Sequence, residues 1–235
     1  TGYAYVGPTG FSPSSASDTS NSISFPTIPR VSDLSVNKTS VPADGATTIT
    51  ATATKKSSSF TDTIVCKLGS YSQTVTSGTA FTIPATWINA ISGTSATATV
   101  TVTTKSGSTT VGTKSVTFTV TVPESVKPTV SNVAVSEAVS SVTSAFGNRY
   151  VKTLSRLNVE VTAAGIYGST ISSYSTSVDG VTYPGQSFQS NALNTAGTLQ
   201  LKTTVTDSRG RTGELTKSIT VVDYFPPTIT GMTYI

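Results

Sequence analysis

Apolar and polar residues alternate on both sides of a short turn in the stretch from Leu199 to Val222. Leu199 and Leu201 alternate with polar residues before the turn Asp207-Ser208-Arg209-Gly210, and Ile219 and Val221 alternate with Thr and Ser after it. Alternation of period two around a Gly-containing turn predicts a β-hairpin. We expect Asp207 to hydrogen-bond to the backbone two residues on, and Gly210 to adopt a positive φ. A hairpin of this length needs a second sheet over its apolar face.

The same pattern occurs once earlier in the chain, between Ala96 and Val122. Here the alternating residues flank the turn Lys105-Ser106-Gly107-Ser108. The segment 113–117, Thr-Lys-Ser-Val-Thr, then resembles the segment 216–220, Thr-Lys-Ser-Ile-Thr. Two similar hairpins in one chain indicate two copies of one architectural module.

A second repeated feature is Pro-Thr followed by Ile or Val, at Pro26, Pro128 and Pro227. The intervals are 102 and 99 residues (128 − 26 and 227 − 128). A period of about 100 residues is the size of an immunoglobulin-like sandwich. The sequence therefore predicts an all-β protein of tandem immunoglobulin-like antiparallel β-sandwiches. We expect the end of a preceding domain plus a Ser-rich linker at 1–26, sandwiches at 27–125 and 126–224, and a further repeat or linker at 225–235.

Further alternation places the remaining strands. In the first sandwich they are expected near 31–36, 47–54, 61–68, 71–76, 96–104 and 110–122, and in the second near 129–135, 155–162, 171–178 and 180–183, before the hairpin. The turn Asp179-Gly180 separates two of these strands.

At 84–91 the alternation breaks, and Pro84 followed by Trp87, Ile88 and Ile91 on one face predicts one or two helical turns. We expect Trp87 to close the end of the core, with stacking on a sugar as the alternative.

The connection between the sandwiches runs from Val122 to Pro128 and contains two prolines. Proline restricts φ, so we expect this connection to be short and stiff rather than a flexible tether.

The composition excludes several classes of protein. Charged residues make up only 11% of the chain, and the net charge of +4 is spread over both sandwiches. There is no basic stripe, so we do not expect a nucleic-acid partner. No segment approaches the ~20 apolar residues of a membrane span. No signal peptide is recognised, and because the chain does not begin with Met we expect it to belong to a longer polypeptide.

The chemistry of an active site is also missing from the pattern. The chain has no histidine, which excludes a Ser-His-Asp triad, a Cys-His dyad and His-bound zinc. Its one cysteine, Cys66, lies in a predicted core strand and is expected to be a buried small side chain. The acidic residues are scattered, without a calcium-binding cluster. We therefore expect no enzyme activity, no cofactor and no metal site.

One segment of the second sandwich has features of a binding loop. Residues 136–151 form a longer excursion that contains Arg149 and Tyr150, two side chains suited to a polysaccharide. Loops on rigid sandwiches often carry binding residues, although a loop that simply packs is the commoner case. Tyr3 and Tyr5 also have a binding interpretation, but isolated aromatic residues usually pack against a neighbouring domain.

From Phe25 to Tyr224 the chain resembles a family of tail-associated structural proteins from long-tailed phages of Gram-positive bacteria. The resemblance lies in residues 25–30, in the strand pair 96–122, in Ser172–Thr176 before Asp179–Tyr183, and in 204–212. It implies immunoglobulin-like modules in a virion protein, located on the phage tail and assembled in the host cytoplasm. It also implies other tail proteins as partners, host cell-surface polysaccharide as a candidate ligand, and allows a homo-oligomer in the full-length protein.

Three functions therefore remain open. The first is a non-enzymatic spacer or host-attachment (receptor-binding) module of the phage tail. The second is a bacterial surface adhesin, which would be distinguished by a wall anchor or signal peptide in the full gene. The third is a carbohydrate-binding module of a wall-degrading enzyme, which would be distinguished by a catalytic domain elsewhere in the chain.

Overall fold

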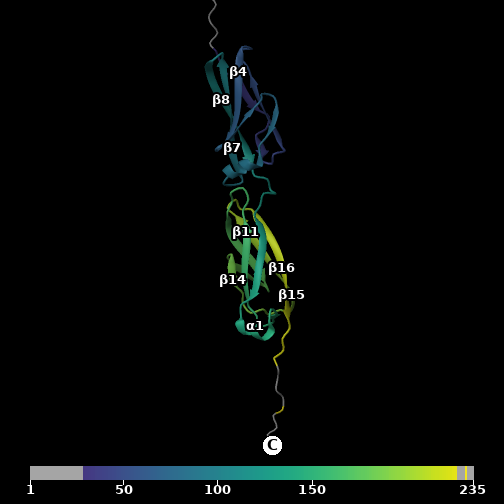
Figure 1. Ribbon diagram of the computed structural model, residues 1–235. Helices are drawn as coiled ribbons and strands as arrows, with labels where there is room; N and C mark the ends of the chain where they lie inside the picture. The colour runs from purple at the N-terminus through teal and green to yellow at the C-terminus, as the bar shows by residue number, and fades with distance from the viewer. Residues whose placement is uncertain (1–28, 227–230, 232–235) are drawn as a thin grey trace, which may run out of the picture.

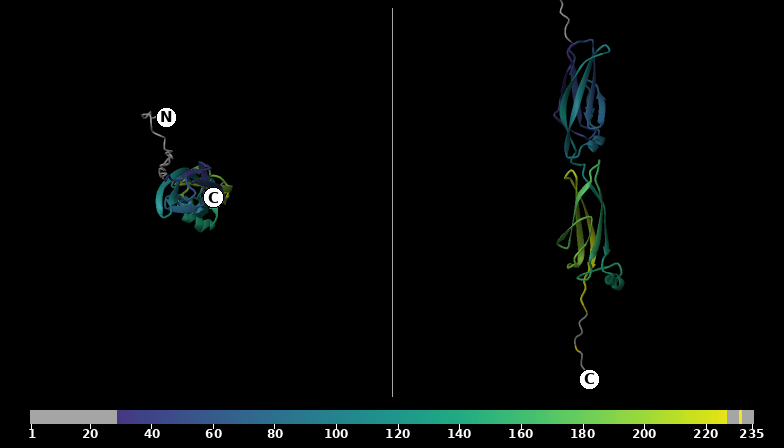
Figure 2. Two further views of the ribbon diagram at one scale, coloured as in Figure 1. Left: turned by 90° about the horizontal axis from the view of Figure 1, so that it is seen from above. Right: turned by 90° about the vertical axis from the view of Figure 1, so that its left-hand side faces the viewer.

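Two β-sandwiches follow one another end to end (Figure 1 and Figure 2). The computed structural model describes residues 29–226 and residue 231. The predicted N-terminal segment 1–26, with Tyr3 and Tyr5, and the first Pro-Thr feature lie outside the described residues. In both side views the long strands run roughly along the axis on which the sandwiches are stacked.

The first sandwich packs a three-stranded sheet against a five-stranded one. The smaller sheet has the order β1 (Asp33–Val36), β3 (Thr48–Thr54), β6 (Ala80–Thr82). The larger sheet has the order β2 (Ser40–Pro42), β8 (Thr109–Thr121), β7 (Ser95–Ser106), β4 (Phe60–Leu68), β5 (Tyr71–Val75). All neighbours are antiparallel except β2 and β8, which are parallel.

The second sandwich repeats this topology strand for strand. Its smaller sheet contains β9 (Thr129–Glu137), β11 (Leu157–Ala164) and β14 (Ser187–Gln189). Its larger sheet has the order β10 (Tyr150–Val151), β16 (Thr212–Val222), β15 (Gly197–Asp207), β12 (Ile171–Val178), β13 (Val181–Pro184). Again the pair formed by the second and last strands, β10 and β16, is parallel. The predicted all-β tandem of sandwiches is confirmed.

The long strands lie where alternation predicted them, and the short ones were missed. β2, β6, β10 and β14 have only two or three residues each, too few to display a period of two. The segment 136–151 was expected to be a loop, but it contains helix α1 (Ser140–Phe146) and strand β10. α1 has no side-chain cap and consists largely of Ser, Thr and Val, so the usual signals of a helix are absent from its sequence.

The core of the first sandwich is closed by the short 3-10 helix η1 (Ala85–Ala90). Pro84 stands directly before the helix, and Trp87 and Ile88 are buried in the core. The indole of Trp87 stacks on Tyr71, with ring centroids 6.0 Å apart. The expected position of Trp87 at the end of the core is therefore confirmed, and a sugar could not reach its face without displacing Tyr71. Cys66 is buried in the same core, as expected.

The core of the second sandwich is a separate cluster. It is formed by inward-facing Val, Leu and Ile side chains of β9, β11, β12, β15 and β16, including Leu157, Leu201 and Val205. Two buried hydroxyls, those of Thr176 and Thr203, hydrogen-bond to each other at 2.9 Å and so satisfy one another inside the core.

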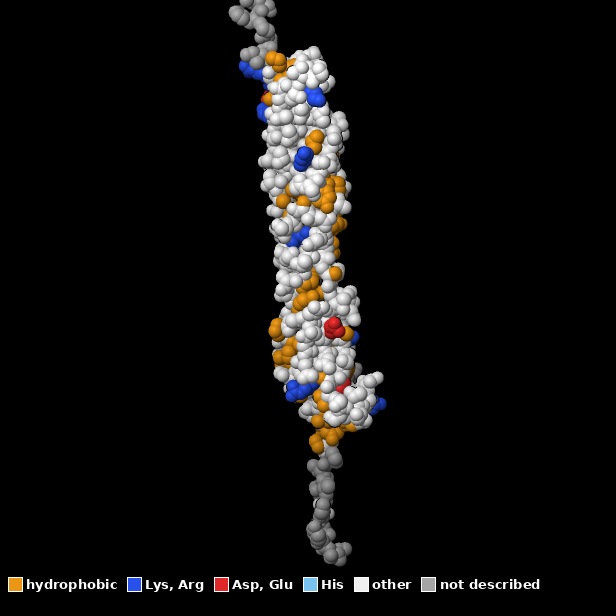
Figure 3. Space-filling view, turned by 60° about the vertical axis from the view of Figure 1, so that its left-hand side comes forward, with side chains coloured by type: hydrophobic (Ala, Val, Ile, Leu, Met, Phe, Trp, Pro, Cys, Tyr) orange, Lys and Arg blue, Asp and Glu red, His pale blue; other side chains and the backbone are white. Residues whose placement is uncertain are grey.

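The surface reflects the composition. Figure 3 shows few charged side chains, widely separated, on a surface made mostly of uncharged polar groups and backbone. No helix in the described part of the chain has the length and apolar character needed to cross a membrane.

The two separate cores lead to a prediction about folding units. Leu201 is fully buried in the second sandwich, so Leu201→Ala should destabilise that sandwich by about 2–5 kcal/mol. Trp87, the single tryptophan, reports only on the first sandwich. In denaturant titrations, Leu201→Ala should move part of the circular-dichroism transition and leave the fluorescence midpoint nearly unchanged.

The matched variant is Ile49→Ala, which removes an equally buried side chain from the first core and should move the fluorescence midpoint. If Leu201→Ala shifts the fluorescence midpoint as far as Ile49→Ala does, the cores unfold as one unit and the predicted boundary near residue 126 is wrong.

Candidate functional site: the joint between the sandwiches

The end of the second sandwich that faces the first is formed by the hairpin turn between β15 and β16. Asp207 is buried, and its Oδ1 accepts hydrogen bonds from the backbone N–H groups of Arg209 and Arg211, both at 2.9 Å. Gly210 has φ 77°, in the left-handed region that favours glycine. The predicted roles of Asp207 and Gly210 are therefore confirmed. Their consequence, which the sequence did not reveal, is that the turn presents the side chain of Arg209 to the other sandwich.

The Arg209 guanidinium is buried in the joint and donates to backbone carbonyls of both sandwiches. From the first sandwich it reaches the carbonyl oxygens of Ile91, 3.1 Å from Nε, and Ile88, 3.2 Å from Nη2. From the second it reaches those of Ile166, 2.8 Å from Nη1, and Tyr167, also through Nη2. One side chain thus ties two sandwiches together through four acceptors.

These acceptors belong to short irregular segments rather than to sheet strands. Ile88 lies in η1 and Ile91 follows it, and the Ile88 carbonyl also accepts from the Ile91 N–H at 2.9 Å, so that Arg209 uses its second acceptor position. Their dipoles also favour a cation at this end. Ile166 and Tyr167 belong to the loop between β11 and β12, where Tyr167 has the uncommon φ of 49°. The Tyr167 side chain packs against the core of the first sandwich, so apolar contact accompanies the hydrogen bonds.

The burial of Arg209 makes these hydrogen bonds a strong constraint. Only 8% of the residue is exposed. A buried charge is costly unless it is fully hydrogen-bonded, and a hydrogen bond to a charged group contributes about 1.5–3 kcal/mol. A shift of one sandwich relative to the other would leave the guanidinium facing carbonyls it no longer reaches. The joint is therefore stable in one arrangement.

The connecting segment is also held against the second sandwich. Arg211 Nη2 donates to the Val122 carbonyl at 2.8 Å. Arg211 also forms an ion pair with Glu124, without the geometry of a hydrogen bond, and Glu124 is so exposed that the pair contributes little. A Cβ placed on Gly213 would lie 2.0 Å from the Pro128 carbonyl oxygen, so only glycine permits this close approach. The predicted stiffness of the connection has this physical basis in addition to its prolines.

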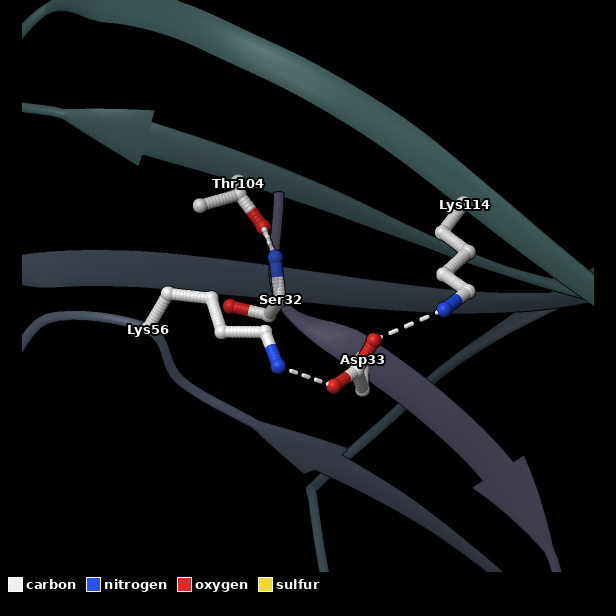
Figure 4. Close-up of polar contacts among 5 residues, drawn as sticks. All are labelled: Ser32, Asp33, Lys56, Thr104 and Lys114. Atoms are coloured by element: carbon white, nitrogen blue, oxygen red, sulfur yellow. Dashed lines mark hydrogen bonds and ion pairs between the residues drawn. The ribbon is translucent and has the colours of Figure 1, made fainter. Parts of the chain in front are cut away.

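The chain is secured in a similar way where it enters the first sandwich (Figure 4). The Ser32 N–H donates to Thr104 Oγ1 at 3.1 Å, and both side-chain hydroxyls donate to Asp62 Oδ1. Asp33 accepts from Lys114 Nζ at 2.7 Å and from Lys56 Nζ, and these two hydrogen bonds lower the pKa of Asp33 to about 2. The first sandwich thus anchors its incoming chain through β4, β7, β8 and the connection before β4.

The two side chains predicted for binding do not form a shared site. Arg149 is exposed just before β10. The Tyr150 ring packs against the second core, and its hydroxyl donates to the Val135 carbonyl at 3.2 Å. Burial, together with the charge of Glu137, raises the pKa of Tyr150. Lys217 Nζ donates to the Val133 carbonyl on the same strand at 2.7 Å, so Tyr150 and Lys217 both cover the outer edge of β9.

The described residues also offer little chemistry elsewhere. Residues 29–226 and 231 contain no group of three His, Cys, Asp or Glu side chains placed to hold a metal ion. A hollow of about 440 Å³ lies over β9, β11 and β14, where Ser136, Asn158, Glu160 and Ser187 face outward, but it is open to solvent. Burial raises the pKa of the Cys66 thiol to about 12, which removes it as a nucleophile near neutral pH.

Solved structures with similar tandem sandwiches come from several contexts. They include fibronectin(III)-like modules of CbhA from Clostridium thermocellum, 14% identical over 86% of this chain and 100% of that chain, with a TM-score of 0.33. Immunoglobulin domains 1–4 of Sidekick-1 are 14% identical over 83% of this chain and 49% of that chain, with a TM-score of 0.40. A 1.5-MDa bacterial ice-binding adhesin is 14% identical over 83% and 65% of the two chains, with a TM-score of 0.32. At these identities and TM-scores nothing that those proteins do is carried over to this chain.

Sequence comparison points to one family. No curated protein matches the chain. A family model described as "Siphovirus protein of unknown function (DUF859)" matches residues 4–232, almost the entire sequence.

The role of Arg209 can be tested by loosening the joint. Arg209→Ala removes all four hydrogen bonds, and Arg209→Lys keeps the charge but offers one nitrogen in place of the three guanidinium nitrogens that reach the four carbonyls. In NMR relaxation measurements the wild-type chain should tumble as one elongated body. Both variants should give each sandwich a shorter rotational correlation time, closer to that of an isolated sandwich.

Arg149→Ala is the matched control, because it removes an exposed arginine that lies away from the joint. Retention of common, anisotropic tumbling in Arg209→Ala would show that other contacts suffice to fix the two sandwiches.

A second prediction concerns Cys66. Because the thiol is fully buried and its pKa is raised to about 12, native protein at pH 8 should react with Ellman's reagent no faster than the first sandwich unfolds. Denatured protein should react at once, with one thiol per chain. Rapid labelling of the native protein would contradict the assignment of Cys66 as a purely structural residue.

Proposed function

We propose that this chain, which belongs to the siphovirus family DUF859, is a non-enzymatic structural component of the phage virion that acts as a tail-associated spacer. The observation that carries the proposal is the joint. Arg209 bridges the two sandwiches through four buried hydrogen bonds, and a spacer needs this kind of defined, stiff connection. A module that only displayed a binding loop would not require one.

The dimensions of the sandwiches suit this role. The strands β7 and β8 have 12 and 13 residues, so each sandwich adds about 40 Å of reach at ~3.3 Å per residue. The short connection adds little length but prevents folding back, because Pro128 lies directly against Gly213. Two sandwiches in line would thus place a neighbouring domain at a set distance from the virion body.

The surface also supports a spacer more than an enzyme. The side chains are weakly charged and mostly Thr and Ser, which gives solubility without strong electrostatic attraction. The chain lacks histidine, and Cys66 is buried. We propose that its partners are other tail proteins and that it is assembled with them in the host cytoplasm, where unpaired cysteine is the normal state.

Host attachment is the second candidate within the same proposal. Exposed Arg149 and the open hollow over β9, β11 and β14 are the surfaces that could meet a cell-surface polysaccharide. Tyr150 is less suited than the sequence suggested, since its hydroxyl is already engaged by the Val135 carbonyl. The adhesin and carbohydrate-binding alternatives receive no support beyond the shared sandwich fold.

The spacer role can be tested in the phage itself. Removing residues 128–226 deletes one 99-residue period (227 − 128) and joins Lys127 to Pro227-Thr228, which restores the Pro-Thr feature. Cryo-electron microscopy of the virions should then show the density beyond this protein displaced toward the virion body by about one sandwich length, ~40 Å. Virions carrying Arg209→Lys should keep the average distance but show blurred distal density.

Two results would contradict the proposal. One is the absence of the protein from purified virions. The other is saturable, host-specific binding of the labelled chain to cells or wall glycans that is lost in Arg149→Ala combined with Tyr150→Phe, which keeps the packed ring. That result would identify an attachment module.

A further inference from the structure

The end of the second sandwich that lies away from the joint exposes an apolar surface. Leu154, Val222 and Phe225 are all exposed there, and Phe225 is 78% exposed. Strand β10 pairs with the end of β16, which brings the segment containing Leu154 next to Val222. Figure 3 shows hydrophobic side chains gathered at this lower end of the described chain. Apolar groups clustered in this way usually mark a contact surface.

Helix α1 enlarges the same end. It lies at the tip of the second sandwich, next to the point where the chain leaves it (Figure 1). The ring of Phe146 at the end of α1 meets Tyr224 edge to face, with centroids 5.8 Å apart. In the first sandwich only residues 37–39 join β1 to β2, and the corresponding end carries η1 instead. In the second sandwich this end carries the aromatic pair Phe146 and Tyr224.

The sequence indicates what covers this surface. Val126 and Phe225 each stand two residues before a Pro-Thr pair, and each follows a buried valine by four residues, Val122 and Val221. Val126 is half-buried and packs against the first core at the joint. Phe225 holds the corresponding position with nothing packed over most of its ring among the described residues.

We propose that this apolar end is the docking surface for a third sandwich of the same polypeptide, which begins at the repeated feature Pro227-Thr228-Ile229. Phe225 takes the place in the second joint that Val126 takes in the first. This inference does not depend on whether the protein spaces or attaches.

The second joint differs from the first in its chemistry. In the first joint Glu124 pairs with Arg211 of the following sandwich. The acid in the corresponding position, Asp223, pairs with Lys152 of its own sandwich at 3.3 Å. Asp223 therefore has a partner within its own sandwich, and the described residues that offer contact to the third sandwich are the apolar side chains of Phe225, Val222 and Leu154. Phe225 is larger than Val126, its counterpart in the first joint, and so supplies more buried area.

The test extends the chain along its natural reading frame by one further period of about 99 residues and compares it with the 235-residue chain by hydrogen exchange. We expect the amides of Val222–Phe225 to exchange at least about tenfold more slowly in the longer protein, because a docked end opens less often. Phe225→Ala in the longer protein should remove this protection. The control Lys105→Ala changes an exposed residue of β7 in the first sandwich and should leave it unchanged.

Three outcomes would overturn the proposal. The first is that the reading frame stops, or loses the repeat pattern, within this further period. The second is that the amides of Val222–Phe225 exchange at the same rate in the longer protein as in the 235-residue chain, which would mean that the added part is not docked. Finally, the 235-residue chain forms a dimer that Phe225→Ala abolishes, which would assign the surface to a second copy instead.

Discussion

The buried positive charge of Arg209 fixes how the two sandwiches are arranged relative to each other. The Arg209 guanidinium is satisfied only while both sandwiches present backbone carbonyls to it at the same time. Among the described residues its hydrogen-bond partners are all backbone carbonyls, so the joint depends on the dipoles of η1 and of the β11–β12 loop.

The turn between β15 and β16 therefore has two roles. Within the second sandwich it closes the central hairpin, and Asp207 orders it by accepting from two backbone N–H groups. Between the sandwiches it supplies Arg209 and Arg211 to the joint. Gly213 adds a third constraint, since any side chain there would meet the Pro128 carbonyl. The residues that define one sandwich thus also define its position relative to the other.

Period-two alternation predicted the long strands, and the repeated hairpin and Pro-Thr feature predicted the tandem of sandwiches. Pro84 and the spacing of Trp87, Ile88 and Ile91 predicted the helical segment at 84–91. The residue types Asp207 and Gly210 predicted the conformation of the turn. Strands of two or three residues, such as β10 and β14, are created by tertiary pairing and carry no periodic signal of their own.

The candidate site was less predictable. The sequence pattern favours Arg149 because it lies in a long connection, and it presents Arg209 only as one residue of a hairpin turn. In the structure Arg149 is exposed and Arg209 is buried. A signal did exist: the turn lies at the sandwich end from which a two-proline connection departs, so a long cationic side chain there had a neighbouring domain within reach. Which carbonyls it would meet depends on η1 and on Tyr167, and only the three-dimensional arrangement brings these together.

The parallel pairing of the second and last strands, found in both sandwiches, determines how the molecule carries mechanical load. The chain enters each sandwich through its first strands and leaves through its last, so tension along the axis pulls β2 against β8 and β10 against β16 in opposite directions. Parallel neighbours pulled in this way slide along their length, and their hydrogen bonds are strained together rather than opened one after another. A pull at the ends of this protein is thus opposed first by shear in these short pairs, each of which lies at the end of the sandwich where the last strand leaves it.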